Sequence, residues 1–537
     1  MSQVLSADEI NGTGFKSPVF EYLPVILVFV GSLGMLFWRL QTSNFMSDEA
    51  LMMVALAAYI LAALFQLTNL YAPSGMAVRI SLWMATLGVF FNLSSWLVRW
   101  VAAYEREIAM LRDAGNPETP WMFRYIPFAN LYDLSIAFAF GAGITTLFFL
   151  NKKNFQVLAA FTLPLAALIL TLARFIGSEF IDLPPVLDSY WRPIHVGVAS
   201  LSYGITLVCF AVAVIYLLKD KVKPESMAVW AAGFSFAVIA TISKFSVLTG
   251  FVYRAGIFVP AQDPTAKPFF SPFRLEIPFV GPLLAVSAIL LLGVIAAFLA
   301  YLYRENLQAK KIGHGLLAAA FVVQLAAVGF WVNGVNGAKD VYPRLQAQIQ
   351  QHPEMVAAAG KELISKQNLT AQEFAAVTQA QFQQQGQQFL QSAGGSMFLS
   401  LKTNPVEFAG IITGIAGLFF VMLFSFRTET IRKRLPSLES LDSLMYKTAC
   451  LAFAGLAMLL ITGAIWANES WGRPWGFDSK ETGALVAWLT YAAFLHTRIS
   501  RGWSGRSSAY FAIVGFLLVI FTYLGVSYLL PGLHSYA

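Results

Sequence analysis

The chain has 537 residues, of which 57% are hydrophobic and only 12% are charged, and its mean hydropathy is +0.64. These values exclude an ordinary soluble domain and indicate an integral membrane protein. The net charge of +7 does not indicate nucleic-acid binding, because lysine and arginine accumulate in the cytoplasmic loops of membrane proteins.

Apolar stretches recur along the whole chain and predict an all-α, polytopic membrane protein with about thirteen transmembrane helices. The N-terminal residues 1–18 are polar with a single basic residue, Lys16, so we expect the first span to be retained rather than cleaved as a signal peptide. The predicted spans are 22–40, 50–71, 79–100, 130–150, 156–177, 195–218, 227–249, 277–303, 314–333, 406–426, 443–466, 483–497 and 508–530.

Basic residues gather in alternate loops between these spans, and a single orientation places all of those loops in the cytoplasm. In that orientation the N-terminus lies inside, whereas the C-terminus and the loop near residue 470 face outward. The basic clusters are Lys152–Lys153, Lys219/Lys221/Lys223, Lys310–Lys311, Arg427/Arg432/Lys433/Arg434 and Arg498/Arg501/Arg506.

The chain divides into three predicted regions: membrane helices in 1–224, inserted helices in 225–440, and a tryptophan-rich membrane domain in 441–537. Residues 250–276 are rich in proline and phenylalanine and are interpreted as an outward loop. Residues 334–405 form the one long extramembrane segment, and their alanine, glutamine and glutamate content favours helices. We expect this segment to be a mainly helical, extracytoplasmic cap or docking element.

The loop 466–482 packs three tryptophans, a phenylalanine and five charged residues between two apolar spans. Such a flat aromatic surface with charged groups at its rim suits a large planar ligand with carboxylate tails, and haem is the obvious candidate. Clustered tryptophans are also typical of a membrane–water interface, so an anchoring belt is the alternative. The candidate ligand-binding residues are Trp466, Trp471, Arg473, Trp475, Phe477, Asp478, Lys480, Glu481 and Trp488.

The order of residues in this loop resembles the tryptophan-rich haem-handling motif, or WWD domain, of cytochrome c assembly proteins. The ending 477–482, Phe-Asp-Ser-Lys-Glu-Thr, is similar to the CcsA/ResC-type branch. Phe477 stands where that branch usually has tryptophan, and Arg473-Pro474 interrupts the aromatic run. The resemblance extends to 188–218 and to 126–133, whereas 225–440 resembles nothing that we could place.

Three of the five histidines are candidate iron ligands. By the orientation above, His195 and His534 lie at outward helix ends on the same face as the tryptophan loop. The resemblance implies that this pair holds haem axially beneath the loop. His496 lies deeper along its helix, and the resemblance implies that it binds a second, inner haem whose other ligand comes from a partner chain.

The resemblance further implies a function in cytochrome c biogenesis. The protein would bind haem b non-covalently, as a substrate in transit, and present it for thioether attachment to an apocytochrome Cys-x-x-Cys-His segment. A CcsB/ResB-type membrane subunit would be its partner in a cytochrome c synthase, or haem lyase, complex. Thiol-reducing pathway proteins would keep the apocytochrome cysteines reduced. The implied location is the bacterial inner membrane, with the tryptophan loop facing the periplasm.

The residues assign no catalytic acid or base, and two other functions remain open. A membrane b-type cytochrome would normally carry paired histidines deep in its helices, where this chain offers only His496. A secondary transporter would show internal repeats or paired broken helices, and neither is apparent. The two cysteines, Cys209 and Cys450, form no Cys-x-x-Cys or Cys-x-x-Cys-His motif, so the chain is neither a covalent c-type cytochrome nor a Cys-x-x-Cys thiol reductant.

Overall fold

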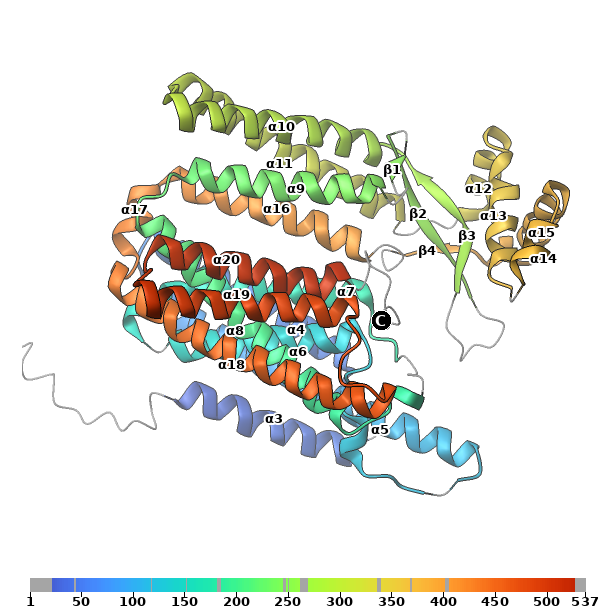
Figure 1. Cartoon of the computed structure of the whole chain (residues 1–537), viewed down its shortest axis with the longest axis horizontal. Helices are drawn as coiled ribbons and strands as arrows, with labels where there is room; N and C mark the ends of the chain where they lie inside the picture. Colours follow the sequence, from blue (N-terminus) through green and yellow to red (C-terminus); the bar gives the residue numbers. More distant parts are fainter. Residues whose placement is uncertain are drawn as a thin grey trace, which may run out of the picture. The chain divides into compact units, whose positions relative to one another are not determined.

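A computed structural model shows two compact units, one formed by residues 1–222 with 429–537 and the other by residues 223–428. Figure 1 shows the helices and strands of both units. The structure describes residues 22–42, 45–116, 118–150, 152–180, 185–244, 248–249, 251–260, 269–335, 340–367, 369–400 and 405–526.

The first unit is a helical bundle in which α8 packs against α6, α18 and α20. Short 3-10 turns at Met122–Tyr125, Lys153–Leu158 and Pro185–Leu187 connect its helices, and a π-helical turn at Phe521–Gly525 follows the last one. The helices are α3 (Leu23–Gln41), α4 (Asp48–Tyr71), α5 (Gly75–Asp113), α6 (Leu131–Leu150), α7 (Ala159–Ile176), α8 (Trp191–Lys219), α18 (Leu438–Trp471), α19 (Ser479–Arg501) and α20 (Arg506–Ile520). The short helix α17 (Thr428–Arg434) leads into α18.

Close approach of α6 and α8 depends on glycine. A Cβ atom on Gly204 would lie 2.4 Å from the backbone carbonyl carbon of Gly141, so neither helix backbone leaves room for a side chain there. Small residues at a helix crossing allow this contact within a membrane. The crossing brings the start of α8 beside the start of α6, where the candidate site lies.

The second unit contains the helices α9 (Pro224–Lys244), α10 (Val280–Arg304), α11 (Leu307–Val335) and α16 (Pro405–Phe426). The helix α9 packs against both α10 and α16, and α10 packs against α11. Their shared interior contains a buried polar cluster, in which Gln324 Nε2 donates to Ser235 Oγ at 2.8 Å and to Ser287 Oγ at 2.9 Å. This cluster joins three helices of the unit.

Each of the thirteen predicted spans overlaps a helix in the described part of the chain. The span 227–249 extends past the end of α9 at Lys244 and includes β1, and the span 508–530 extends beyond the described residues. Twelve of the described helices are long and apolar enough to cross a membrane, which confirms the polytopic all-α fold. The exception is α19, because only residues 482–497 separate Glu481 from Arg498 and they include three threonines.

The interpretation of residues 250–276 as a loop is wrong, because these residues form most of a small antiparallel sheet. The strands are β1 (Leu248–Thr249), β2 (Val252–Val259), β3 (Phe269–Ile277) and β4 (Phe398–Leu399), and β2 pairs with each of the other three. Alternate residues of β2 are buried, as expected for a strand with one face on a core. Proline and phenylalanine content had obscured this alternation.

The segment between α11 and α16 is mainly helical, as predicted. Its helices are α12 (Val341–Gln351), α13 (Glu354–Ser365), α14 (Ala371–Ala375) and α15 (Gln379–Ala393), and a 3-10 turn follows at Gly394–Ser396. Ala357, Ile364 and Phe382 form a small core between α13 and α15. Gln348 of α12 binds the edge of β3, accepting from the Glu276 N–H at 3.0 Å and donating to the Arg274 carbonyl at 3.3 Å. These bonds attach the helices to the sheet.

Candidate functional site

The main pocket of the first unit lies where α8, α18, α19 and the start of α6 meet. The empty space inside it and in its open mouth together is about 1210 Å³. The lining is mostly apolar, with three tryptophans and a few polar groups. Its residues include Phe128, Ala129, Asn130, Leu131, Leu187, His195, Tyr203, Leu459, Gly463, Trp466, Trp471, Trp475, Lys480 and Glu481.

His195 lies one turn into α8 and is half-buried against α18. Its Nδ1 lies 3.0 Å from the carbonyl oxygen of Leu459 and 3.4 Å from Thr462 Oγ1. A carbonyl only accepts hydrogen bonds, so the proton of the neutral imidazole is on Nδ1 and the lone pair is on Nε2. This is the tautomer that a metal-ligating histidine needs, with the second nitrogen oriented by the protein.

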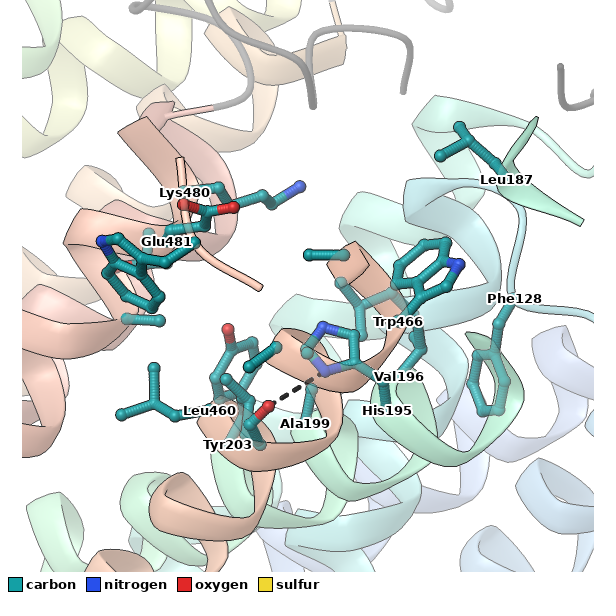
Figure 2. Close-up of a pocket in the computed structure, with 18 of the residues that line it drawn as sticks. Phe128, Leu187, His195, Val196, Ala199, Tyr203, Leu460, Trp466, Lys480 and Glu481 are labelled. Atoms are coloured by element: carbon teal, nitrogen blue, oxygen red, sulfur yellow. Dashed lines mark hydrogen bonds between the residues drawn. The ribbon is translucent and has the colours of Figure 1, made fainter. Parts of the chain in front are cut away.

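The imidazole fits because its neighbour on α18 is glycine. A Cβ atom on Gly463 would come within 2.8 Å of His195 Cε1. On the same wall, the ring of Trp466 lies 5.7 Å from the imidazole centroid at an angle of 46°. Figure 2 shows His195 and Trp466 on one side of the pocket, with the hydrogen bond from His195 drawn as a dashed line. His195 Nε2, the nitrogen that could bind a metal, and the indole ring of Trp466 therefore lie on the same wall of the pocket.

Trp466 is 8% exposed, and its indole N–H has no hydrogen-bond partner within the described residues. Buried indole N–H groups usually find an acceptor. This donor lies in the wall of the pocket, where an acceptor on a bound ligand could reach it.

The loop between α18 and α19 is held in shape by hydrogen bonds from backbone N–H groups to two side-chain carboxylates. Gly472 ends α18 in the left-handed conformation, with φ of 68°. Glu481 Oε2 accepts from the N–H groups of Gly476 at 2.8 Å and of Asp478 at 3.2 Å, and Asp478 caps the start of α19 by accepting from the Lys480 N–H. Glu481 and Asp478 thus form a capping box. Both carboxylates serve the architecture of the loop.

Lys480 faces His195 and Trp466 from the opposite side of the pocket (Figure 2). It is half-buried in the first turn of α19, ahead of the apolar part of that helix. Burial lowers the pKa of its ammonium group to about 8, and the nearby Asp478 carboxylate opposes part of that shift. A carboxylate of a bound ligand would stabilise the charged form of Lys480.

Six predicted site residues therefore lie together around one pocket. They are His195, Trp466, Trp471, Trp475, Lys480 and Glu481.

Four other predicted residues lie outside the pocket lining: Arg473, Phe477, Asp478 and Trp488. Arg473 folds back over Gly476, whose added Cβ would lie 2.9 Å from the guanidinium. Phe477 is 78% exposed and meets Trp475 edge-on at 6.0 Å. Trp488 stacks on Phe453 at 5.3 Å and joins α19 to α18.

Of the two remaining iron-ligand candidates, the structure describes His496 but not His534. His496 is exposed on α19, fifteen residues beyond Glu481, and so about 22 Å away along the helix axis. The described residues contain no group of three or more histidine, cysteine, aspartate or glutamate side chains placed to hold a metal. His534 lies outside the described residues, so its pairing with His195 stays a prediction.

Sequence reasoning missed part of the pocket. Tyr203, two turns below His195 on α8, forms its floor (Figure 2). The strip Phe128–Leu131 forms another wall. The resemblance over 126–133 was the available signal for that strip, and the resemblance over 188–218 was the available signal for Tyr203.

Comparison with known proteins identifies the family of the chain. A family model described as "Cytochrome C assembly protein" matches residues 128–258 and 275–534, well over half of the chain. The match includes most of 225–440, for which sequence analysis found no resemblance. It also includes the tryptophan loop and every residue of the pocket.

Several curated relatives are called "Cytochrome c biogenesis protein CcsA". The one from Prochlorococcus marinus (strain MIT 9515) is 47% identical over 133 residues, 25% of this chain and 43% of the relative. The one from Parasynechococcus marenigrum (strain WH8102) is 52% identical over 103 residues, which are 19% of this chain and 34% of the relative. The one from Chlamydomonas reinhardtii is 43% identical over 132 residues, which are 24% of this chain and 37% of the relative.

The chain spans less than half the length of these curated relatives in the matching segments. The resemblance to the CcsA type is confirmed by both comparisons. On its sequence match and its architecture, the chain belongs to the cytochrome c assembly protein family.

Proposed function

We propose that the chain functions in cytochrome c biogenesis by binding haem b non-covalently in this pocket and presenting it for attachment to apocytochrome c. The observation that carries the proposal is the hydrogen bond from His195 Nδ1 to the Leu459 carbonyl. That bond orients the metal-binding nitrogen of an imidazole within a large aromatic pocket.

Each wall of the pocket has a separate task in this proposal. His195 supplies one axial ligand to the haem iron, and His534 is proposed as the ligand from the opposite side. Trp466, Trp471 and Trp475 pack against the macrocycle. Lys480 binds a haem carboxylate through a charge-assisted hydrogen bond.

The attachment reaction needs positioning more than acid or base groups of this chain. Each apocytochrome thiol adds across a haem vinyl group, so a C–S and a C–H bond form while an S–H bond and the vinyl π bond break. The protein would hold haem with its vinyl edge accessible. One of its own histidines would then leave the iron, and the histidine of the apocytochrome segment would take its place. Glu481 accepts two backbone N–H groups, and we assign it no catalytic role.

The proposal includes a CcsB/ResB-type membrane subunit. His496 is exposed on α19, so a ligand from a partner chain can approach it to complete a second, inner haem position. The two chains together would form a cytochrome c synthase, and a thiol-reducing pathway would supply apocytochrome with free cysteines.

The proposed location is the bacterial inner membrane, with the tryptophan loop and the C-terminus toward the periplasm. The support is the distribution of basic residues on alternate loops. Single cysteines at Phe477 and Lys311, each in a background lacking Cys209 and Cys450, test it. In intact spheroplasts we expect an impermeant maleimide to label the Phe477→Cys protein only. Labelling of the Lys311→Cys protein alone would reverse the orientation.

The functional test is co-purification of haem. We expect the full chain, co-expressed with its CcsB/ResB-type partner, to carry haem that acid–acetone extracts and that gives the pyridine haemochrome spectrum of haem b. The matched comparison is the same complex with Lys480→Met, which we expect to retain less haem. A complex without extractable haem would contradict the proposal.

A further inference from the structure

A fully buried arginine lies next to the pocket and belongs to none of the site residues described above. Arg99 of α5 has no exposed surface. Its Nε donates to the carboxylate of Asp133, and its NH1 group donates to the Ser178 carbonyl at 2.6 Å and lies 3.3 Å from Asp48 Oδ2. The guanidinium of this α5 residue therefore binds three other segments: the start of α4, the start of α6 and the loop after α7.

Aromatic rings enclose this guanidinium. Arg99 Cζ lies 4.6 Å from the ring centroid of Tyr132 and 4.3 Å from that of Phe180. Tyr132 also bonds to the cluster, donating its hydroxyl to Asp48 at 3.0 Å. Burial, planar stacking and several acceptors at once are features that arginine provides and lysine does not.

Asp133 connects Arg99 to the pocket wall. Its Oδ2 accepts from the backbone N–H of Ala129 at 2.9 Å, and its own N–H donates to Asn130 Oδ1 at 2.9 Å. Asn130 then donates its amide to the Glu179 carbonyl at 2.9 Å. Ala129 and Asn130 both line the pocket. The path from the guanidinium to the pocket lining is thus two hydrogen bonds long.

These contacts differ from those of an ion pair that only joins helices. One oxygen of Asp133 binds Arg99 and the other binds the backbone of a pocket residue. Asp133 is 1% exposed, so loss of the arginine would leave a buried carboxylate without its cation. With nothing holding Oδ1, the carboxylate can turn away from the Ala129 N–H, and that part of the pocket wall loses its anchor.

We propose that Arg99 is a positioning residue that fixes the Phe128–Leu131 wall through Asp133 and so sets the width of the pocket. The identity of the ligand as haem rests on the proposed function above. The position of the wall does not, and it can be measured separately.

The first measurement reports the wall alone. A single cysteine, Ala129→Cys, is placed in the full chain with Cys209→Ala and Cys450→Ala, and the reaction rate of its thiol with a maleimide is measured with and without Arg99→Gln. We expect Arg99→Gln to raise the rate, because a wall without its anchor opens more often and exposes the thiol. The rate in Arg99→Lys is expected to lie between the rates of the wild type and Arg99→Gln, because an ammonium group cannot bridge all of these acceptors.

The matched control is Arg498→Gln. Arg498 forms an ion pair with Asp442 in the same unit, and neither residue lines the pocket. We expect the maleimide reaction rate of the Ala129→Cys thiol to be unchanged in this control. If Arg99→Gln does not yield folded protein, Asp133→Asn takes its place under the same criterion, since it keeps the shape of the side chain and removes its charge.

The second measurement is haem affinity of the same variants. We expect Arg99→Gln to weaken it about tenfold and Arg498→Gln to leave it unchanged. If Arg99→Gln or its substitute leaves the reaction rate of the Ala129→Cys thiol unchanged, the positioning proposal is overturned, whatever the haem result. A raised rate together with no haem binding in the wild-type chain would leave the positioning role standing and sink the proposed function.

Discussion

The imidazole of His195 packs directly on Gly463, where an added methyl group would lie 2.8 Å from ring Cε1. The ring therefore occupies a place on α18 that has no side chain, and its Nδ1 reaches the Leu459 carbonyl one turn earlier. The histidine and the glycine together define the orientation of the metal-binding nitrogen.

The first prediction concerns this contact. Gly463→Ala is expected to push the imidazole away from α18 and to weaken haem binding by about tenfold or more, although alanine favours the helix itself. The measurement is a haem titration followed by the Soret band. Gly329→Ala, at a position on α11 with nothing within 4 Å of the added Cβ, is the control. Equal affinity in Gly463→Ala and wild type would show that this contact does not orient the ligand.

The second prediction concerns the capping box of the tryptophan loop. Glu481→Ala removes the acceptor for the Gly476 and Asp478 N–H groups, which is expected to cost about 1 kcal/mol of local stability. Hydrogen exchange of residues 472–481 should accelerate, and Trp475 should lose its defined position in the pocket. Gln381→Ala, in the capping box of α15, should leave exchange in 472–481 unchanged. Unaltered exchange in Glu481→Ala would refute the architectural role.

The third prediction is a pH dependence that comes from Lys480. Its pKa of about 8 in the unliganded protein means that the ammonium loses its proton as pH rises through 8. Haem affinity is therefore expected to fall between pH 7 and pH 9. Lys480→Arg should remove this dependence because arginine stays charged, and Lys480→Met should bind weakly at every pH. A wild-type affinity that is flat over this range would exclude Lys480 as a carboxylate ligand.

The same pKa shift has the opposite effect on the stability of the unliganded protein. The folded-state pKa lies below the usual lysine value of 10.5, so the unfolded chain binds more protons between pH 8 and pH 10.5. The contribution of Lys480 to the free energy of unfolding must therefore rise with pH across that window. Opposite slopes for binding and stability distinguish the Lys480 effect from general alkaline unfolding.

The fourth prediction concerns the helical segment α12–α15. It contributes no residue to the pocket, so replacing 341–393 by a flexible linker is expected to preserve the haem spectrum while lowering apocytochrome maturation, if the segment docks a partner or substrate. The strand β4 is kept because it pairs with β2. Gln348→Ala, which removes only the bonds to the edge of β3, is the control. Loss of haem on deletion would mean that the segment shapes the site.

Hydropathy was sufficient to predict the helices, because a membrane demands long apolar spans whatever their packing. The orientation rule also placed the start of the His195 helix and the end of the Trp466 helix at one face, and the structure brings these two residues together. The side that this face occupies is still a prediction.

The missed features have physical reasons. Tyr203, Phe128, Ala129 and Leu131 line the pocket, but their residue types do not differ from those of lipid-facing neighbours. The sequence Asp478-Ser-Lys-Glu481 was interpreted as a charged rim, although the same spacing before an apolar helix is typical of a capping box. Contacts between residues far apart in the sequence, such as Arg99 with Asp133, depend on topology that a single sequence does not reveal.

The most direct test of the account is the absorption spectrum of His195→Gly purified with its partner, with and without added imidazole. We predict a reduced Soret band without imidazole and its recovery when imidazole fills the position of the lost side chain. His352→Gly, at an exposed position beside Glu354, should match the wild type throughout. A Soret band in His195→Gly equal to that of the wild type, without imidazole, would contradict the assignment of His195 as a haem ligand.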